Sequence, residues 1–436
     1  MEDIVQFDVP KVLLVGLDTG EDTFFAQSMQ ELKNLAEACN MEVVGSIVQR
    51  NSDINKTYYI GPGKVMEVKE LAEELKADTV IFDNALSPSQ LNNLQDEIGL
   101  AIMDRTTLIL EIFATRAMSK EAMLQVETAR LQYILPRLTG LGKALSRQGG
   151  TSGSKSSRGA GEKKLELDRR YLESRLAECR RELKAVSEKR ITQRKKRTES
   201  GIPRVALVGY TNAGKSTLLN AFLEDFSKEE NAKERKVMAK DMLFATLDTT
   251  VRKIAPVGKS PFLLSDTVGF IHKLPHNLVE AFKSTLEETA EADLLLMVVD
   301  AGDDNHREHI EVTKTTLNEI GAGHVPVLYV YNKADRIMEQ DKLPVIREDR
   351  IYISAKQKIG LQALYDLIMN HLSKGFYKCR MLIPFGRGDI VTKLINDGAV
   401  LKQEYTQEGV YLKLNVKEED YNRYQEFVVE DEKEDS

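Results

Sequence analysis

The sequence has few cysteines and no long apolar run. Among its 436 residues only Cys39, Cys179 and Cys379 are cysteines, and they do not follow the spacing of metal ligands. This scarcity argues against a disulfide framework and indicates reduced thiols, as in a cytoplasmic protein. No stretch approaches the roughly 18 apolar residues of a membrane span, so at most a peripheral association is expected. The opening residues, MEDIVQFDVPKVLLV, lack a basic segment, and we expect no secretory signal.

Charge is distributed unevenly along the chain. The net charge of −7 argues against a general nucleic-acid binder. Residues 139–201, however, contain 18 Lys/Arg and 8 Asp/Glu, a net charge of +10 that leaves −17 for the rest. This asymmetry indicates a local basic surface for a polyanionic partner.

The first 117 residues alternate between strand-like and helix-like segments. Short apolar runs at 12–18, 42–48, 78–84 and 100–104 are separated by helix-period stretches such as 63–77. This alternation predicts a small α/β domain over 1–117 with a mostly parallel sheet. Within it, the turn IGPGK (60–64) is interpreted as a helix start, because it lacks the spacing of a phosphate-binding loop.

Residues 118–200 are predicted to form an antiparallel helical hairpin that projects from this domain. Ser119 would cap a first helix that ends at Leu135, before Pro136. A charged second helix over 164–197 carries a narrow apolar seam suited to one partner helix. The seam comprises Leu165, Leu172, Leu176, Cys179, Leu183 and Val186, and it would face Leu124, Leu131 and Leu138.

The glycine-rich connection 139–161 is predicted to form the tip of this hairpin. It contains seven glycines and four Lys/Arg, with no acidic residue. Composition alone allows either a solvated, disordered linker or a flexible basic tip that orders on a polyanion such as RNA. The sequence after it predicts a second α/β domain over 201–374, an α+β domain over 375–428 and a disordered acidic tail over 429–436.

The second α/β domain begins with a phosphate-binding pattern. RVALVGYTNAGKSTLLNAF (204–222) contains G-x-x-x-x-G-K-S from Gly209 to Ser216, after an apolar strand and at the start of a helix, as a P-loop requires. The glycines let backbone N–H groups turn toward the phosphates, and the helix N-terminus favours the same anion. Lys215 would contact the β/γ-phosphate oxygens, and the Ser216 hydroxyl would be a Mg²⁺ ligand.

Further motifs select the nucleotide. FLLSDTVG (262–269) ends in D-x-x-G, in which Asp266 would reach the metal through water and the Gly269 N–H would sense the γ-phosphate. VLYVYNKAD (327–335) ends in N-K-x-D, and the Asp335 carboxylate can accept from the N1–H and 2-amino groups of guanine, a donor pair that adenine lacks. YISAK (352–356) places the Ala355 N–H near the guanine O6. This set predicts GTP as the substrate.

Two positions remain open from the residues alone. Between P-loop and D-x-x-G, the stretch DMLFATLDTTVRKI (241–254) should supply a second Mg²⁺ ligand, for which Thr246, Thr249 and Thr250 all qualify. Directly after D-x-x-G, where many GTPases carry a glutamine that orients water, this chain has Phe270. We therefore expect slow hydrolysis by the protein alone, accelerated when a partner orders the switch loops.

The chain resembles the HflX family of ribosome-associated GTPases over nearly its whole length. The segments that carry the resemblance include TYYIGPGKVMEV (57–68), VIFDNALSPSQLNNL (80–94), DRTTLILEIFATRA (104–117), LQYILPRLTG (131–140), LSRQGG (145–150), GEKKLELDRR (161–170), FATLD (244–248) and DTVGFIHKLPH (266–276). The resemblance places the second metal-binding threonine at Thr246 and implies a hydrophobic residue at position 270. The chain departs from the family pattern at the tip, where the glycine run is interrupted as GGTSGSKSSRGAGE, and at Thr249, where proline is common.

Motifs and resemblance together give the expected site. Lys215, Thr246 and Gly269 are expected to act in catalysis, and Ser216 and Thr246 to bind Mg²⁺. The expected nucleotide-binding residues are Gly209, Tyr210, Thr211, Asn212, Ala213, Gly214, Lys215, Ser216, Thr217, Phe244, Ala245, Thr246, Leu247, Asp248, Asp266, Thr267, Val268, Gly269, Asn332, Lys333, Ala334, Asp335, Ser354, Ala355 and Lys356.

The resemblance implies a GTPase that binds the large ribosomal subunit, through rRNA and ribosomal proteins, and separates stalled or idle ribosomes under stress. Apart from the resemblance, we expect a monomer in the cytoplasm. A first alternative is a ribosome-assembly or RNA-remodelling NTPase with a second nucleotide site in the N-terminal domain. A second is a switch that acts through protein or membrane partners, which would show little of the salt dependence of RNA binding.

Overall fold

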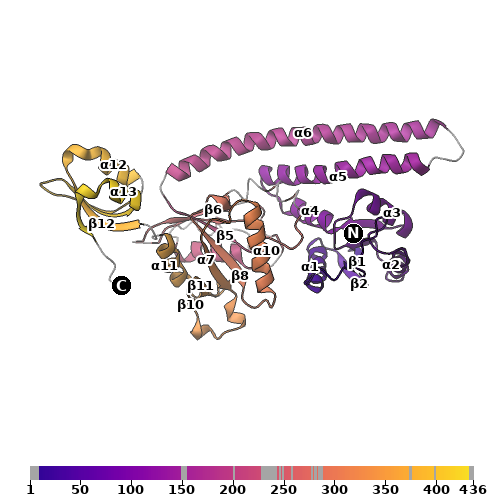
Figure 1. The fold of residues 1–436 in the computed structure, drawn as a ribbon, viewed down its shortest axis with the longest axis horizontal. Coiled ribbons are helices and arrows are strands. Elements are labelled where there is room, and N and C mark those ends of the chain that lie inside the picture. Colours follow the sequence, from indigo (N-terminus) through magenta and orange to yellow (C-terminus); the bar gives the residue numbers. More distant parts are fainter. Residues whose placement is uncertain are drawn as a thin grey trace, which may run out of the picture. The chain divides into compact units, whose positions relative to one another are not determined.

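The computed structural model describes residues 9–148, 155–199, 202–226, 243–244, 247, 250–256, 259–275, 278, 282, 288–372, 376–396 and 399–431. The chain forms two compact units; Figure 1 shows its helices and strands, coloured along the sequence. One comprises Met1–Ala185, Lys240–Asp248 and Val268–Thr285, and the other comprises Val186–Ala239, Thr249–Thr267 and Leu286–Ser436.

The N-terminal sheet is parallel, with the order β2-β1-β3-β4. Its elements are β1 (Lys11–Asp18), α1 (Phe25–Ala38), β2 (Glu42–Arg50), α2 (Pro62–Glu74), β3 (Thr79–Phe82), α3 (Pro88–Ile98), β4 (Ala101–Asp104) and α4 (Arg105–Arg116). This confirms the predicted strands and the helix start at IGPGK. The inner strands are continuous apolar runs because helices cover a parallel sheet on both faces.

The hairpin consists of α5 (Lys120–Gln148) and α6 (Lys155–Glu199), and the Ser119 hydroxyl caps α5 by accepting from the Ala122 N–H at 3.0 Å. The predicted seam is confirmed where Leu124, Leu131, Leu176 and Cys179 form one buried cluster, flanked by Leu135, Leu172 and Leu183. Arg175 of α6 adds an ion pair to Glu127 of α5 at 2.6 Å.

Two predictions for the hairpin are wrong. Pro136 does not end the first helix but lies inside α5. Pro136 lacks the N–H that would donate to the Gln132 carbonyl, but α5 packs on α3 and α4, and this packing outweighs the loss of one donor. The tip is also shorter than 139–161, because helix extends to Gln148 and resumes at Lys155. Residues 149–154 lie outside the described residues.

The second unit contains a seven-stranded sheet, β10-β11-β9-β8-β5-β7-β6, antiparallel only where β6 joins β7 and β10 joins β11. Its elements are β5 (Arg204–Val208), α7 (Lys215–Phe226), β6 (Thr250–Ile254), β7 (Phe262–Asp266), β8 (Leu294–Asp300), α10 (His306–Glu319), β9 (Val327–Asn332), β10 (Val345–Arg347), β11 (Arg350–Tyr352) and α11 (Leu361–Leu372). A core that includes Leu207, Phe222, Leu264 and Ile368 joins α7 and α11 to this sheet. The predicted P-loop GTPase fold is confirmed.

The C-terminal part forms an antiparallel sheet, β13-β14-β12-β15. Its elements are β12 (Phe376–Ile383), α12 (Gly388–Asn396), β13 (Val400–Tyr405), β14 (Val410–Lys417), α13 (Glu418–Arg423) and β15 (Val428–Asp431). The prediction that the acidic tail 429–436 is wholly disordered is wrong, because β15 pairs with β12; residues 432–436 lie outside the described residues. Within the described residues, no helix is long and apolar enough to cross a bilayer.

Candidate functional site

The P-loop connects β5 to α7 at the carboxyl edge of the large sheet. Gly209 and Gly214 have φ values of +141° and +95°, in a region that residues with a Cβ rarely adopt. A Cβ on Gly209 would collide with the Val298 carbonyl, and one on Gly214 with the Asn332 amide. Both positions therefore require glycine, and the loop turns tightly enough for its backbone N–H groups to surround a phosphate.

Lys215 is buried at the start of α7, with 7% of the residue exposed. Its ammonium donates to the carbonyls of Gly209 at 2.9 Å and Tyr210 at 2.8 Å. Burial lowers the pKa of Lys215 to about 8, and the nearby Asp266 charge opposes this only in part. A phosphate anion beside the ammonium would favour the charged form, so this side chain suits the predicted contact to the β/γ-phosphates.

Ser216 and Asp266 meet beside the P-loop. The Ser216 hydroxyl donates to a carboxylate oxygen of Asp266 at 2.6 Å, because β5 and β7 are paired in parallel with Leu207 opposite Asp266. A hydroxyl next to a carboxylate at the phosphate end of a P-loop is the oxygen donor set that Mg²⁺ prefers. The two residues therefore fit the predicted metal, with Ser216 as a direct ligand and Asp266 reaching it through water.

The guanine-specific loops are held together by Asn332. Its amide donates to the Ala213 carbonyl at 3.0 Å, and its amide oxygen accepts from the Ala355 N–H at 2.9 Å. One side chain thus links the P-loop, N-K-x-D and SAK segments. Asp335 lies in the short 3₁₀ helix Ala334–Arg336 that follows, and Ser354 and Ala355 are both buried.

Lys333 is placed by a residue that the sequence motifs did not indicate. Its ammonium donates to the Asn212 carbonyl at 2.7 Å and forms an ion pair with Asp300 at 2.8 Å. Asp300 ends β8, the strand next to β9, and the strand pairing places Asp300 opposite Asn332. The sequence does show Asp300 as an acidic residue at the end of the apolar run LLLMVVD. It does not show that Lys333 is its partner, because that depends on β8 lying next to β9 in the sheet.

The remaining expected residues are only partly described. Ala245, Thr246 and Asp248 lie outside the described residues, so the second metal-ligand position stays a prediction. Phe244, Leu247, Val268, Gly269 and Phe270 belong to the first unit. There the rings of Phe244 and Phe282 pack edge-to-face on Phe113 of α4, with centroids 4.6 and 5.0 Å apart. Phe270 is itself 2% exposed, so the residue that replaces the glutamine is a buried one.

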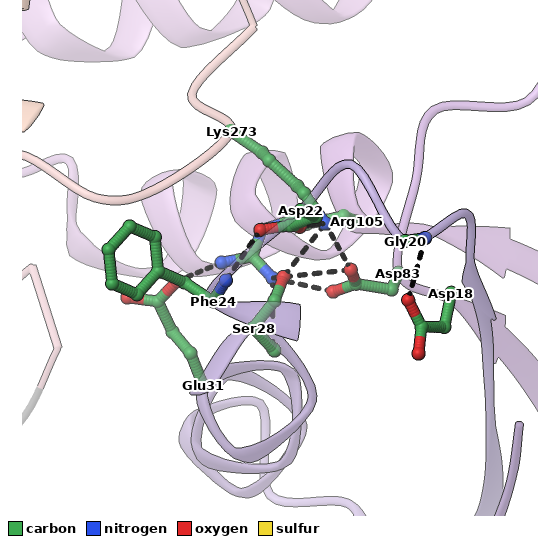
Figure 2. Close-up of polar contacts among 9 residues, drawn as sticks. All are labelled: Asp18, Gly20, Asp22, Phe24, Ser28, Glu31, Asp83, Arg105 and Lys273. Atoms are coloured by element: carbon green, nitrogen blue, oxygen red, sulfur yellow. Dashed lines mark hydrogen bonds and ion pairs between the residues drawn. The ribbon is translucent and has the colours of Figure 1, made fainter. Parts of the chain in front are cut away.

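A second polar cluster lies in the first unit, at the carboxyl edge of the N-terminal sheet (Figure 2). Asp83 follows β3 and pairs with Arg105 at 2.7 Å; Arg105 begins α4 and also pairs with Glu31. Lys273, seven residues after Asp266, donates to Asp83 at 2.6 Å and to Ser28 at 3.0 Å. The segment that follows D-x-x-G is thereby fixed to the N-terminal sheet. Asp83, Arg105 and Lys273 each stand in a segment that carries the family resemblance, but nothing in the sequence indicated that they meet.

Asp83 stays ionised despite its burial. Burial by itself would raise the pKa of Asp83, but Arg105 and Lys273 outweigh that effect and hold the pKa below its usual value. The same balance, with Lys273 as the neighbouring cation, lowers the pKa of Asp22. The pKa of His272 is lowered by burial and by the charge of Lys273, which favours a neutral imidazole.

Comparison with known proteins gives the family. Residues 26–114 match a family described as GTP-binding GTPase N-terminal, 116–197 a GTP-binding GTPase Middle Region, and 204–333 a 50S ribosome-binding GTPase. The chain is 43% identical to the GTPase HflX of Caldanaerobacter subterraneus subsp. tengcongensis over 98% of this chain and 96% of that protein. The chain belongs to the HflX family of GTPases. It is also 38% identical to the GTPase HflX of Escherichia coli, over 88% of each chain.

A GTP-binding protein from the archaeon Sulfolobus solfataricus, solved with GDP, is similar at 25% identity and a TM-score of 0.41, over 84% of this chain and 99% of that one. As an HflX-family member, this chain is a GTPase that hydrolyses GTP.

Proposed function

We propose that this HflX-family GTPase binds the large ribosomal subunit in its GTP-bound state and separates stalled or idle ribosomes under stress. GTP binding is supported by the Asn332 side chain, whose hydrogen bonds to Ala213 and Ala355 link the three loops that contact a guanine nucleotide. The match of residues 204–333 to a family described as 50S ribosome-binding supports the ribosomal partner. The net charge of +10 over 139–201, on and around the long helices α5 and α6, supports contact with rRNA.

Hydrolysis in this proposal uses Mg²⁺ held by Ser216 and Thr246. Bound there, the ion would neutralise charge on the β- and γ-phosphate oxygens. Lys215 would add a positive charge at the same oxygens, and the Gly269 N–H would report whether the γ-phosphate is present. Because the buried Phe270 cannot orient water, the ribosomal partner would order the switch segments, an effect that reaches about 10³–10⁵-fold in other GTPases.

The proposal includes the division of the chain at residues 117, 200 and 374, a monomeric state and a cytoplasmic location. Binding supplies the free energy that separates the subunits, and hydrolysis then lowers the affinity so that the protein is released.

The alternative with a second nucleotide site gains less support from the described residues. At IGPGK the Gly61 N–H already donates to the Gln49 side chain at 2.8 Å, so it is not available to a phosphate. The carboxyl edge of the N-terminal sheet, where open parallel sheets bind ligands, is filled by Arg105 and Lys273.

Nucleotide-dependent sedimentation tests the proposal. Purified protein is centrifuged with large subunits in the presence of GDP, GTP or a non-hydrolysable GTP analogue. We expect more protein to co-migrate with the analogue than with GDP, and Lys215→Ala to remove the difference. Equal co-migration with GDP and the analogue would contradict the proposal, and intact ribosomes separated equally well by the GDP form would contradict the splitting step.

A further inference from the structure

The second unit carries a groove between α10 and the strands β9 and β11. This hollow, which we call the groove, has a volume of about 630 Å³, within the range of roughly 300–1,000 Å³ that small-ligand sites occupy. Its lining residues lie outside G-x-x-x-x-G-K-S, D-x-x-G, N-K-x-D and SAK, although three tyrosines among them stand on the strands that lead into N-K-x-D and SAK. Its walls are instead aromatic and basic, which indicates a ligand other than the guanine nucleotide.

Three tyrosines form the floor of the groove. β11 pairs in parallel with β9, with Arg350 opposite Tyr329 and Tyr352 opposite Tyr331. Since side chains alternate along strands, Tyr329, Tyr331 and Tyr352 share one face, while Leu328, Val330 and Ile351 enter the core on the other. The rings of Tyr331 and Tyr352 stack, with centroids 4.7 Å apart and planes within 15°.

The groove is also positively charged. Three cations line it, Arg307 and Lys314 from α10 and Arg350 from β11, against one carboxylate, Glu311. Glu311 is already paired with Lys314 at 3.1 Å, and Lys314 lies 6.0 Å from the Tyr329 ring centre. Neither Arg307 nor Arg350 forms an ion pair or side-chain hydrogen bond with any residue in the part of the chain that the structure describes. Two guanidinium groups are therefore available to an anionic ligand.

The chain connection explains why this face of the sheet is open. Residues 333–349, between β9 and β11, contain only the 3₁₀ turns Ala334–Arg336 and Gln340–Lys342 and the edge strand β10, and no α-helix covers the tyrosines from that side. α10 packs on the neighbouring strand β8, and its residues between His306 and Lys314 form one wall of the groove. Beside it, Tyr329 and Tyr352 are half-buried and remain partly accessible, whereas Tyr331 is 8% exposed.

We infer that this groove binds unpaired nucleotides of an RNA strand. Aromatic rings offer stacking surfaces to bases of any sequence, and arginines beside them neutralise the phosphates, which is how proteins bind single-stranded nucleic acid. A base would stack on the partly accessible rings of Tyr329 and Tyr352. The inference deepens the proposed ribosomal function by naming a recognition surface, yet it can be tested without ribosomes.

Crosslinking the full-length protein to RNA locates the bound strand. The probe is a fluorescein-labelled single strand of about 12 nucleotides containing 4-thiouridine, since sites of this kind cover about 4–16 nucleotides. We expect crosslinked peptides to include 327–332 or 350–352. Crosslinks confined to α5 and α6 would overturn the inference while leaving the ribosomal proposal intact.

Variants then test the two parts of the groove by affinity for the same strand. Arg307→Glu with Arg350→Glu should weaken binding at least tenfold and reduce the steepness of log affinity against log salt by roughly 1.4, because two phosphate contacts at about 0.7 each are lost from a single strand. Tyr329→Leu should weaken binding by about fivefold or more through lost stacking. Matched controls are Arg347→Glu on β10 and Tyr405→Leu on β13, neither of which lines the groove.

The outcomes separate the possible occupants. A duplex of the same sequence should lose no affinity in Tyr329→Leu, because its bases are not free to stack. If poly-glutamate bound as tightly as the RNA and with the same dependence on Arg307 and Arg350, the groove would be an acidic-protein site and the inference would fail. Unchanged RNA affinity in the double arginine variant would also overturn it. Sedimentation with large subunits, measured separately, reports on the proposed function.

Discussion

The two parallel sheets of this protein use their carboxyl edges in opposite ways. At the edge of the large sheet, Lys215, Ser216 and Asp266 lie beside the P-loop, whose backbone N–H groups suit a phosphate. At the edge of the N-terminal sheet, Asp83 is neutralised by Arg105 and Lys273 from the protein itself. The same topology can therefore provide a ligand site or an internal ion-pair cluster, and the charges placed after the strands decide which.

The largest expected effect concerns guanine selection at the carboxyl edge of the large sheet. Asp335→Asn removes the carboxylate that accepts from guanine, and we expect GTP affinity to fall by roughly 10⁴-fold, because polar groups are left unpaired in a site built for them. Fluorescent-nucleotide titration measures the loss. Xanthosine triphosphate, which carries an oxygen in place of the 2-amino group, should bind the variant better than GTP does. A variant that kept its GTP affinity would disprove the assigned role of Asp335.

The second prediction concerns the buried cluster. Asp83→Ala removes one carboxylate partner from Arg105, which is 2% exposed and keeps Glu31, and removes the same carboxylate from Lys273. We expect the N-terminal sheet to lose about 3–5 kcal/mol of stability. Hydrogen exchange of the amides in β3 and β4 reports this local free energy. Asp18→Ala is the matched control at the same edge, since its partner Arg50 is exposed, and it should cost less than about 1 kcal/mol. Equal effects would contradict the special role of Asp83.

The third prediction is a pH dependence that only the nucleotide edge should show. Because the pKa of Lys215 is about 8 in the free protein and a bound phosphate favours the charged form, nucleotide binding takes up a proton above that pH. GTP affinity should therefore fall by roughly tenfold between about pH 7 and pH 9. In Lys215→Arg, whose guanidinium stays charged, the weaker binding should be independent of pH over this range. A flat profile for the original protein would show that Lys215 is already fully protonated.

The smallest expected effect belongs to Lys273. Lys273→Met keeps the length of the side chain but removes its charge, while Arg105 continues to neutralise Asp83. We expect the exchange-derived stability of β3 to fall by only about 0.5–1.5 kcal/mol, since the Lys273 side chain is 23% exposed. Combining this change with Asp22→Asn should give less than the sum of the two effects, because both remove the same ion pair. Additive losses would indicate that Lys273 and Asp22 act independently.

The sequence was most informative where function depends on neighbours along the chain. The P-loop, Asp266 and the N-K-x-D segment were recognisable because each motif follows an apolar strand, and parallel strands bring such ends together. The hairpin seam was also predictable, since spacings of three and four residues place Leu172, Leu176 and Cys179 on one helix face. Predictions failed at Pro136 and at the hairpin tip, where local signals for helix ends were overridden.

The amino-acid sequence alone determined that this protein binds a guanine nucleotide, because the residues that contact the base and the phosphates lie in short contiguous motifs. Tertiary structure decided the rest. Lys273 and Asp83 are 190 residues apart, and the three tyrosines of the groove share a face only because β11 pairs with β9 in one register. Charge pairing and stacking act through space over a few ångströms, so their partners emerge only when the chain has folded.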